Sequence, residues 1–207
     1  MFGQAYGAAL VIVLASTLLG RAICTACGGA RRWWAAPLVG LAALIVLAGA
    51  AIRLPGRGVT AVVVCGLAIL LSGGFLLRGR RPGLPLGDLA VGGVALLGAS
   101  IPFLASGRIG PGAGVDNDMA IHLLIAEAMR SPSMSKIWGF LSSGYPTGPH
   151  SLVATVGTAL DAPLIMVFTG LLMAVVVLTA LGAADLAASA ALWRRVVIGG
   201  LCSLTYL

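Results

Sequence analysis

The chain has 207 residues, of which 59% are apolar and only 9% are charged. Soluble domains carry about 25% charged residues, so this composition excludes that class and predicts a membrane protein. The net charge of +7 would suit a nucleic-acid partner. The arginines, however, stand in pairs and triplets at the ends of apolar segments, which is typical of membrane topology, and we expect membrane lipids and no nucleic acid as partners.

Successive apolar segments predict helices along the whole chain. In hydrocarbon only a helix satisfies its own backbone within one segment, and about 20 residues cross the apolar core. The predicted fold class is all-α: a polytopic transmembrane helical bundle with an extracytoplasmic loop that contains short surface helices. The predicted spans are 4–20, 35–52, 59–77, 86–105 and 162–182, with a sixth that begins near 195.

Three segments follow from this pattern. Residues 1–105 are predicted as a four-span N-terminal bundle, and residues 106–161 as a loop with surface helices and the candidate site. Residues 162–207 are predicted as further spans. Because no polar tail follows the last apolar stretch, we expect the chain to be the N-terminal part of a longer protein.

The distribution of basic residues predicts the orientation in the plasma membrane. Eight basic residues fall on one side of the predicted spans and five on the other, so the side with eight is expected in the cytoplasm. Residues 106–161 then face the exterior. The cytoplasmic set is Arg21, Arg31, Arg32, Arg78, Arg80, Arg81, Arg194 and Arg195, and the external set is Arg53, Arg57, Arg108, Arg130 and Lys136.

The predicted spans themselves carry little chemistry. No charged residue lies near a predicted midplane, whereas transporters usually place ionisable residues there, which favours a simple scaffold for the first four spans. Asp88, Asp161 and Asp185 lie near span ends, where helix capping and interfacial solvation explain them.

The four cysteines predict no disulfide framework. Cys65 and Cys202 lie in apolar runs, where thiols are usually packing residues. Cys24 and Cys27 form a lone CxxC in a predicted connector, which would be half of a metal site or a redox pair, but no second half is present. We therefore interpret the pair as incidental.

The first polar part of the loop predicts a helix with a candidate acidic site. Asn117 or Asp116 can cap a helix that ends near residue 130, and Asp118 and His122 are four residues apart and share a face. Asp116 and Asp118 form a D-x-D pair that can bind a divalent cation. As alternatives, one aspartate is only a cap and His122 only pairs with Asp118, while Glu127 is a solvated surface residue. The apolar positions at helical spacing are Ile121, Leu124, Ile125 and Ala128.

The second polar part predicts another helix that ends near residue 160. Thr147 or Gly148 can cap it, and Pro149 suits its first turn. His150 then lies where free backbone N–H groups favour an anion, and a neutral imidazole there suits phosphate recognition. The alternative is a rigid turn, built by Pro146 and Pro149, that leads into a short re-entrant helix.

These two motifs together resemble a known family. A D-x-D with a nearby His on one helix, followed by Tyr145-Pro-x-Gly-x-His150 at the start of another, is similar to the N-terminal part of polytopic GT-C superfamily glycosyltransferases. The likeness is to the actinobacterial type with a YPxGxH-like element and covers residues 86–185. It implies that Asp116 or Asp118 acts in transfer of a sugar from a polyprenyl-phosphate donor to a cell-envelope acceptor.

The chemistry of such a transfer assigns roles to the loop residues. A carboxylate must take the proton of the acceptor hydroxyl, and cationic or neutral donors must stabilise the departing phosphate. We expect Asp118 as the base and Asp116 as its assistant or as a metal ligand. The expected substrate-binding residues are Arg108, His122, Lys136, Tyr145 and His150, of which His150 with Arg108 or Lys136 receives the phosphate.

Two alternatives to a glycosyltransferase remain open from the sequence. The first is a non-catalytic multi-pass protein, either part of a permease or a scaffold for envelope assembly, with the loop as a docking surface. The second is a polymerase or ligase of lipid-linked polysaccharides, which would favour an arginine and histidine site over paired carboxylates. Both residue types occur in residues 106–161, so their presence favours neither enzyme.

Overall fold

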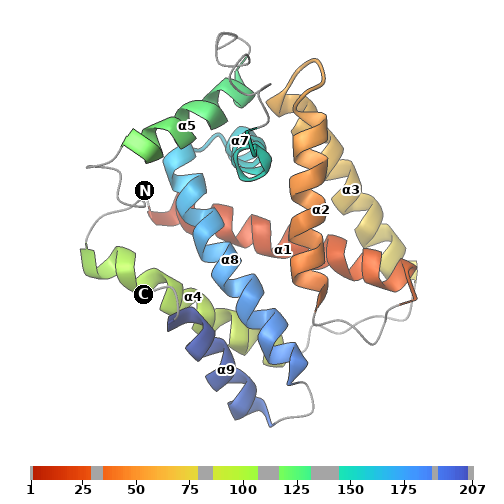
Figure 1. Cartoon of the computed structure of the whole chain (residues 1–207). Coiled ribbons are helices and arrows are strands. Elements are labelled where there is room, and N and C mark those ends of the chain that lie inside the picture. Colours follow the sequence, from red (N-terminus) through yellow and green to blue (C-terminus); the bar gives the residue numbers. More distant parts are fainter. Residues whose placement is uncertain are drawn as a thin grey trace.

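The computed structural model describes residues 2–28, 35–78, 86–106, 117–131, 145–187 and 191–204. All regular secondary structure in these ranges is helical, which confirms the predicted all-α class. In chain order the helices are α1 (Phe2–Ala26), α2 (Ala36–Ala51), α3 (Gly58–Arg78), α4 (Leu86–Ser106), α5 (Asn117–Arg130), α7 (Gly148–Leu160), α8 (Leu164–Leu186) and α9 (Leu192–Leu204), as Figure 1 shows.

Four of these helices, α1, α3, α4 and α8, are long and apolar enough to cross a membrane, which confirms a multi-pass membrane protein. The helix α2 is shorter, with 16 residues, and α9 has 13. The observed bounds follow the predicted spans closely except in α1, which continues to Ala26 instead of ending at residue 20. Cys24 therefore lies in the last turn of α1 and not in a connector, and only Cys27, which is exposed, follows the helix.

The helices α1 and α8 form the centre of the bundle. In α8, 72% of the apolar stretch is buried within the protein, and in α1 50%, against 17% in α3 and 22% in α4. Helices α2, α3 and α7 pack on one side of this central pair, and α4 and α9 pack on the other. The predicted segments 1–105 and 162–207 thus pack together as one bundle (Figure 1).

Glycines bring the central backbones into direct contact. A Cβ at Gly40 of α2 would overlap the Ser16 carbonyl of α1, and a Cβ at Gly170 of α8 would stand 2.6 Å from the Ala5 carbonyl. Lipid tails are as apolar as leucine, so helices in a membrane associate through such close packing and through polar contacts. These small residues therefore fix how α2 and α8 lie against α1.

A network of ion pairs joins four helix ends at one face of the bundle. Asp88 of α4 accepts hydrogen bonds from Arg21 of α1 at 3.2 Å and from Arg195 of α9 at 2.8 Å. Arg195 also reaches Asp185 of α8 at 2.7 Å. Asp88 in the first turn of α4 and Asp185 in the last turn of α8 lie near span ends as predicted, but both carboxylates also pair with an arginine, which the sequence analysis did not predict. Asp161 does lie at a helix end, as the C-cap of α7.

At the opposite face Arg57 fixes the end of α5. Its guanidinium donates to the carbonyls of Ala128 at 3.1 Å and Ser131 at 2.7 Å, which are carbonyls left open at the C-terminus of a helix. Arg21 and Arg195 both pair with Asp88 at one face of the bundle. Arg57 and Arg130 lie at the other face. This division agrees with the two predicted sets of basic residues.

The contact at Gly40 gives the first prediction. Gly40→Ala forces α1 and α2 apart, whereas Gly66→Ala on α3 adds a methyl group where nothing lies within 4 Å. We expect Gly40→Ala to cost about 1–3 kcal/mol or more through overpacking, and Gly66→Ala to be neutral or slightly stabilising because alanine favours helix. The measurement is the thermal unfolding midpoint of both purified variants. Equal midpoints would contradict the close contact.

Candidate functional site

The loop predicted to carry the chemistry contains α5 and α7, which pack against each other and against the first turns of α8. Figure 1 shows α5 across one end of the bundle, beside α7 and the start of α8. The observed bounds confirm both predicted helices, with Thr147 as the N-cap of α7 and a proline in its first turn. These two helices bring together segments that lie apart in the chain.

The helix α7 lies inside the bundle and not on its surface, where it was predicted. Its residues from His150 to Gly157 are all buried. Gly148 lies against Ile45 in the middle of α2, while Gly58 at the start of α3 lies against Thr158 near the other end of α7. The helix therefore begins within the bundle and emerges toward its end, as in the re-entrant alternative.

The hydroxyls of α7, of which Ser151 and Thr155 are buried, form hydrogen bonds within the helix. Ser151, Thr155 and Thr158 each donate to the carbonyl four residues earlier, at 2.7–2.9 Å. Buried polar groups are costly unless they are hydrogen-bonded, so these bonds allow a helix with this many polar residues to enter an apolar bundle.

The centre of the site is a contact between two histidines. Nδ1 of His122 on α5 lies 2.8 Å from Nε2 of His150 at the start of α7. One of these nitrogens must carry a hydrogen and the other a lone pair, so the pair shares a single proton in this contact. Two residues that are 28 positions apart are thus joined into one acid and base group.

Aromatic rings enclose this pair. The Phe168 ring of α8 meets His150 edge-on with centroids 5.9 Å apart, and the Tyr145 ring lies 5.7 Å from His150. Tyr145 also packs against a core cluster that contains Ile125 of α5. The rings exclude water from His150, which is only 4% exposed, while His122 is half-buried.

Burial makes His150 a neutral imidazole. Loss of hydration, with a smaller contribution from the charge of His122, lowers the pKa of His150 from 6.5 to about 4, and the Pro146 backbone opposes this weakly. Nδ1 of His150 is buried and makes no hydrogen bond of good geometry within the described ranges. Of the two histidines, His122 is therefore the more accessible, and it contacts the buried His150.

The other predicted site residues are placed only in part. Asp118 lies in α5 one turn before His122, but its side chain is outside the described structure. Asp116, Arg108 and Lys136 lie outside the described residues altogether. Within the described ranges no three His, Cys, Asp or Glu side chains gather as metal ligands. The predicted cation ligands, Asp116 and the side chain of Asp118, lie outside those ranges.

Two features of the structure were not predicted from the sequence. Phe168 is one apolar residue among many in a predicted span, and nothing in its spacing marks it as a partner of two histidines. The ion-pair network could have been inferred from the sequence, because Asp88 and Asp185 are the only acidic residues on the predicted side with eight arginines. Glu127 lies at the surface as predicted, 3.6 Å from Arg130.

The lowered pKa of His150 predicts a pH dependence of stability. The unfolded chain titrates near pH 6.5 and the folded one near 4, so between these values the unfolded state binds more protons. Stability is then lost as the pH falls from about 6.5 to 4, by up to about 3 kcal/mol. Thermal unfolding midpoints between pH 7.5 and 4.5 measure this loss.

Two variants control this experiment. His150→Gln removes the titrating group, so its midpoint should change less with pH than that of the wild type. His122→Gln should keep most of the pH dependence of the midpoint, because burial is the larger cause of the lowered pKa of His150. A wild-type midpoint that does not fall below pH 6.5 would show that His150 is hydrated.

Comparison of the chain with protein-family models, with curated proteins and with solved structures finds no match. The function proposed for the chain therefore rests on the residues and geometry of the histidine site.

Proposed function

We propose that this chain is a membrane glycosyltransferase, or part of one, that transfers a sugar from a polyprenyl-phosphate donor to a cell-envelope acceptor. The observation that carries the proposal is the contact of His122 with His150. It joins the acidic motif on α5 to the Tyr-Pro-x-Gly-x-His motif of α7, the two motifs on which the resemblance to GT-C glycosyltransferases depends.

The position of the site fits a donor that is anchored in the membrane. The histidine pair lies near the start of α8, at one end of a bundle whose spans cross the bilayer. On α5 the apolar side chains of Ile121 and Leu124 are 45% and 47% exposed, which suits a helix that lies in the membrane interface. A lipid-linked sugar would reach this site by lateral diffusion.

The roles of the residues follow from the transfer. The bond between the sugar C1 and the phosphate oxygen breaks, a bond forms from C1 to the acceptor oxygen, and the acceptor proton passes to the Asp118 carboxylate. His122, held by His150, donates a hydrogen bond to the departing phosphate near the N-terminus of α7. Arg108 or Lys136 would add positive charge there, and Asp116 would assist Asp118 or hold a cation.

Substitution of the proposed base gives the direct test. Asp118→Asn should lower transfer by about 100-fold or more, since general bases contribute about 10²–10⁴ in rate, and should leave folding intact. The assay uses polyprenyl-phosphate mannose and polyprenyl-phosphate glucose as probes with a native envelope extract, and mass spectrometry of the released polyprenyl phosphate. Glu127→Gln, about two and a half turns along α5 and at the surface, is the matched control. Full turnover by Asp118→Asn would exclude this base.

A non-catalytic role makes the opposite prediction in the same assay. If the chain were a permease part or an assembly scaffold, the wild type would release no polyprenyl phosphate from either probe, and the substitutions would leave that result unchanged. The proposal also requires the α5 face to be external, because envelope acceptors lie outside the cytoplasm.

Labelling of cysteines tests this orientation in the plasma membrane. Cys27 is exposed at the arginine-rich face, so in a Cys24→Ser and Cys202→Ser background a membrane-impermeant maleimide should modify it only after permeabilisation. Glu127→Cys, with Cys27→Ser added to the same background, should react in intact cells. The reverse pattern would place the histidine site in the cytosol, away from the acceptors.

A further inference from the structure

The turn between α2 and α3, residues 52–58, touches both helices that carry the histidine pair. Its last residue, Gly58, lies between them, because a Cβ there would stand 2.6 Å from the Thr158 hydroxyl of α7 and 3.5 Å from the Arg130 carbonyl of α5. Thr158 and Arg130 each follow the histidine of their own helix by eight residues, which is about 12 Å along a helix axis. The turn therefore contacts α5 and α7 at matching distances from the two histidines.

Arg57 ties this turn to the end of α5. Its guanidinium donates to the carbonyls of Ala128 and Ser131, at 3.1 and 2.7 Å. The backbone of Arg57 has a φ of 44°, in the left-handed region that favours glycine, and Gly56 before it has a φ of 86°. Such a conformation is strained for an arginine and persists where the surrounding structure fixes it. Here the turn aims the guanidinium at the open end of a helix.

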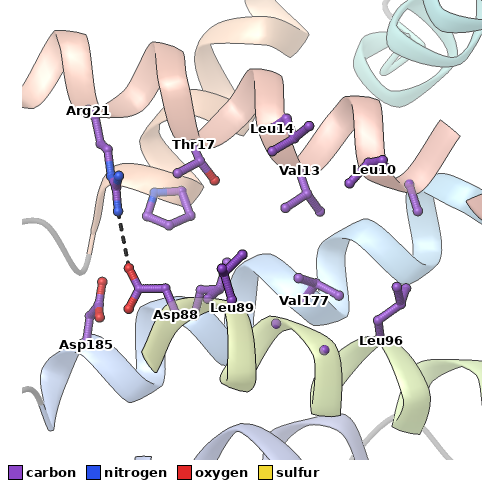
Figure 2. Close-up of a pocket in the computed structure, with 15 residues that line it drawn as sticks. Leu10, Val13, Leu14, Thr17, Arg21, Asp88, Leu89, Leu96, Val177 and Asp185 are labelled. Atoms are coloured by element: carbon purple, nitrogen blue, oxygen red, sulfur yellow. Dashed lines mark hydrogen bonds and ion pairs between the residues drawn. The ribbon is translucent and has the colours of Figure 1, made fainter. Parts of the chain in front are cut away.

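A contact with backbone carbonyls fixes a helix more directly than an ion pair between side chains does. At the other face of the bundle Arg21 reaches the Asp88 side chain, as Figure 2 shows. Two side chains can change rotamer together when their helices shift. The acceptors of Arg57 belong to the α5 backbone, so a shift of α5 along its axis lengthens or bends these hydrogen bonds and weakens them.

Apolar packing connects the turn to the histidine pair. One buried cluster joins α2, α3, α5 and α7, and its members are Ala51, Ile52, Ala61, Ile125, Met129 and Ala154. Tyr145 packs against this cluster, and its ring lies 5.7 Å from that of His150. Met129 of α5 also accepts a hydrogen bond at 3.5 Å from Ser151, the residue after His150. Because packed interiors have few voids, a displacement at the end of α5 reaches the histidines.

We propose that the α2–α3 turn positions the histidine pair, with Arg57 as the positioning residue. By holding α5 against α7 it keeps Nδ1 of His122 within 2.8 Å of Nε2 of His150, where a hydrogen bond forms. Arg57 itself touches neither histidine and acts through the α5 backbone. The effect on catalysis rests on the proposed glycosyl transfer, whereas the effect on the histidine contact does not.

Nuclear magnetic resonance of the full chain with ¹⁵N-labelled histidine measures this contact directly. The sequence has two histidines, so all ring signals come from the pair. At neutral pH the wild type should show a nitrogen–nitrogen coupling across the hydrogen bond. Arg57→Gln should abolish the coupling, and Arg57→Lys, which keeps a charged donor, should retain part of it. Arg53→Gln, at an exposed position in the same turn, is the matched control and should keep the coupling. A folded Arg57→Gln chain with the coupling of the wild type would overturn the proposal.

A second substitution decides the question if Arg57→Gln does not fold. Gly58→Ala places a methyl group against the Thr158 hydroxyl, which donates to the Ala154 carbonyl at 2.8 Å, and should weaken the coupling by displacing α7. Thr158→Ala in the same chain removes that hydroxyl and should restore the coupling, because the Thr158 Cβ stands at an ordinary contact distance of 3.5 Å. Unchanged coupling in Gly58→Ala, or no recovery in the double variant, would show that the turn does not position the pair.

The transfer assay separates this inference from the proposed function. Arg57→Gln should lower kcat by about 10- to 100-fold and change KM less, because misplacement of the reacting groups acts on the chemical step. Full kcat in a variant that has lost the coupling would contradict a role of this positioning in catalysis. A wild type that releases no polyprenyl phosphate would contradict the proposed function alone, because the coupling is measured without substrate.

Discussion

The close contact of α1 with α8 and α2 is the constraint on which the rest of the structure depends. Between helices in a membrane there is no hydrophobic driving force, so a specific arrangement needs surfaces that fit closely or polar groups that pair. Gly170 and Gly40 supply the first, because their backbones lie directly against α1. Asp88 supplies the second, because it joins Arg21 to Arg195. With α1 fixed in this way, α8 becomes the most buried helix and connects the two ends of the bundle.

The histidine site and the ion-pair network both depend on α8. Near its start Phe168 packs edge-on against His150, and near its end Asp185 belongs to the ion-pair network. A displacement of α8 relative to α1 would therefore change the environment of the histidine pair and the geometry of the network together. The glycine contact at Gly170 opposes such a displacement, since it leaves no room for α8 to approach α1 more closely.

The sequence predicted the helices well and the tertiary contacts poorly, for physical reasons. Apolar length and helix capping are local properties, so the spans and the bounds of α5 and α7 were predictable. The end of α1 was misjudged because Arg21 was interpreted as a connector residue, whereas it lies within α1 and pairs with Asp88, 67 residues away. His150 was placed at a surface because its segment is rich in glycine and proline. Gly148 instead lets α7 approach Ile45 closely and enter the bundle.

The histidine site and the ion-pair network avoid an unpaired charge by different means, and this difference separates their chemistry. His150 is neutral because burial lowers its pKa to about 4, and it contacts the half-buried His122 at 2.8 Å. The arginines and aspartates are instead paired with one another, at distances of 2.7–3.2 Å between nitrogen and oxygen. The first arrangement suits a group that acts on a reacting phosphate. The second suits a structural role, because it ties the ends of α1, α4, α8 and α9 together.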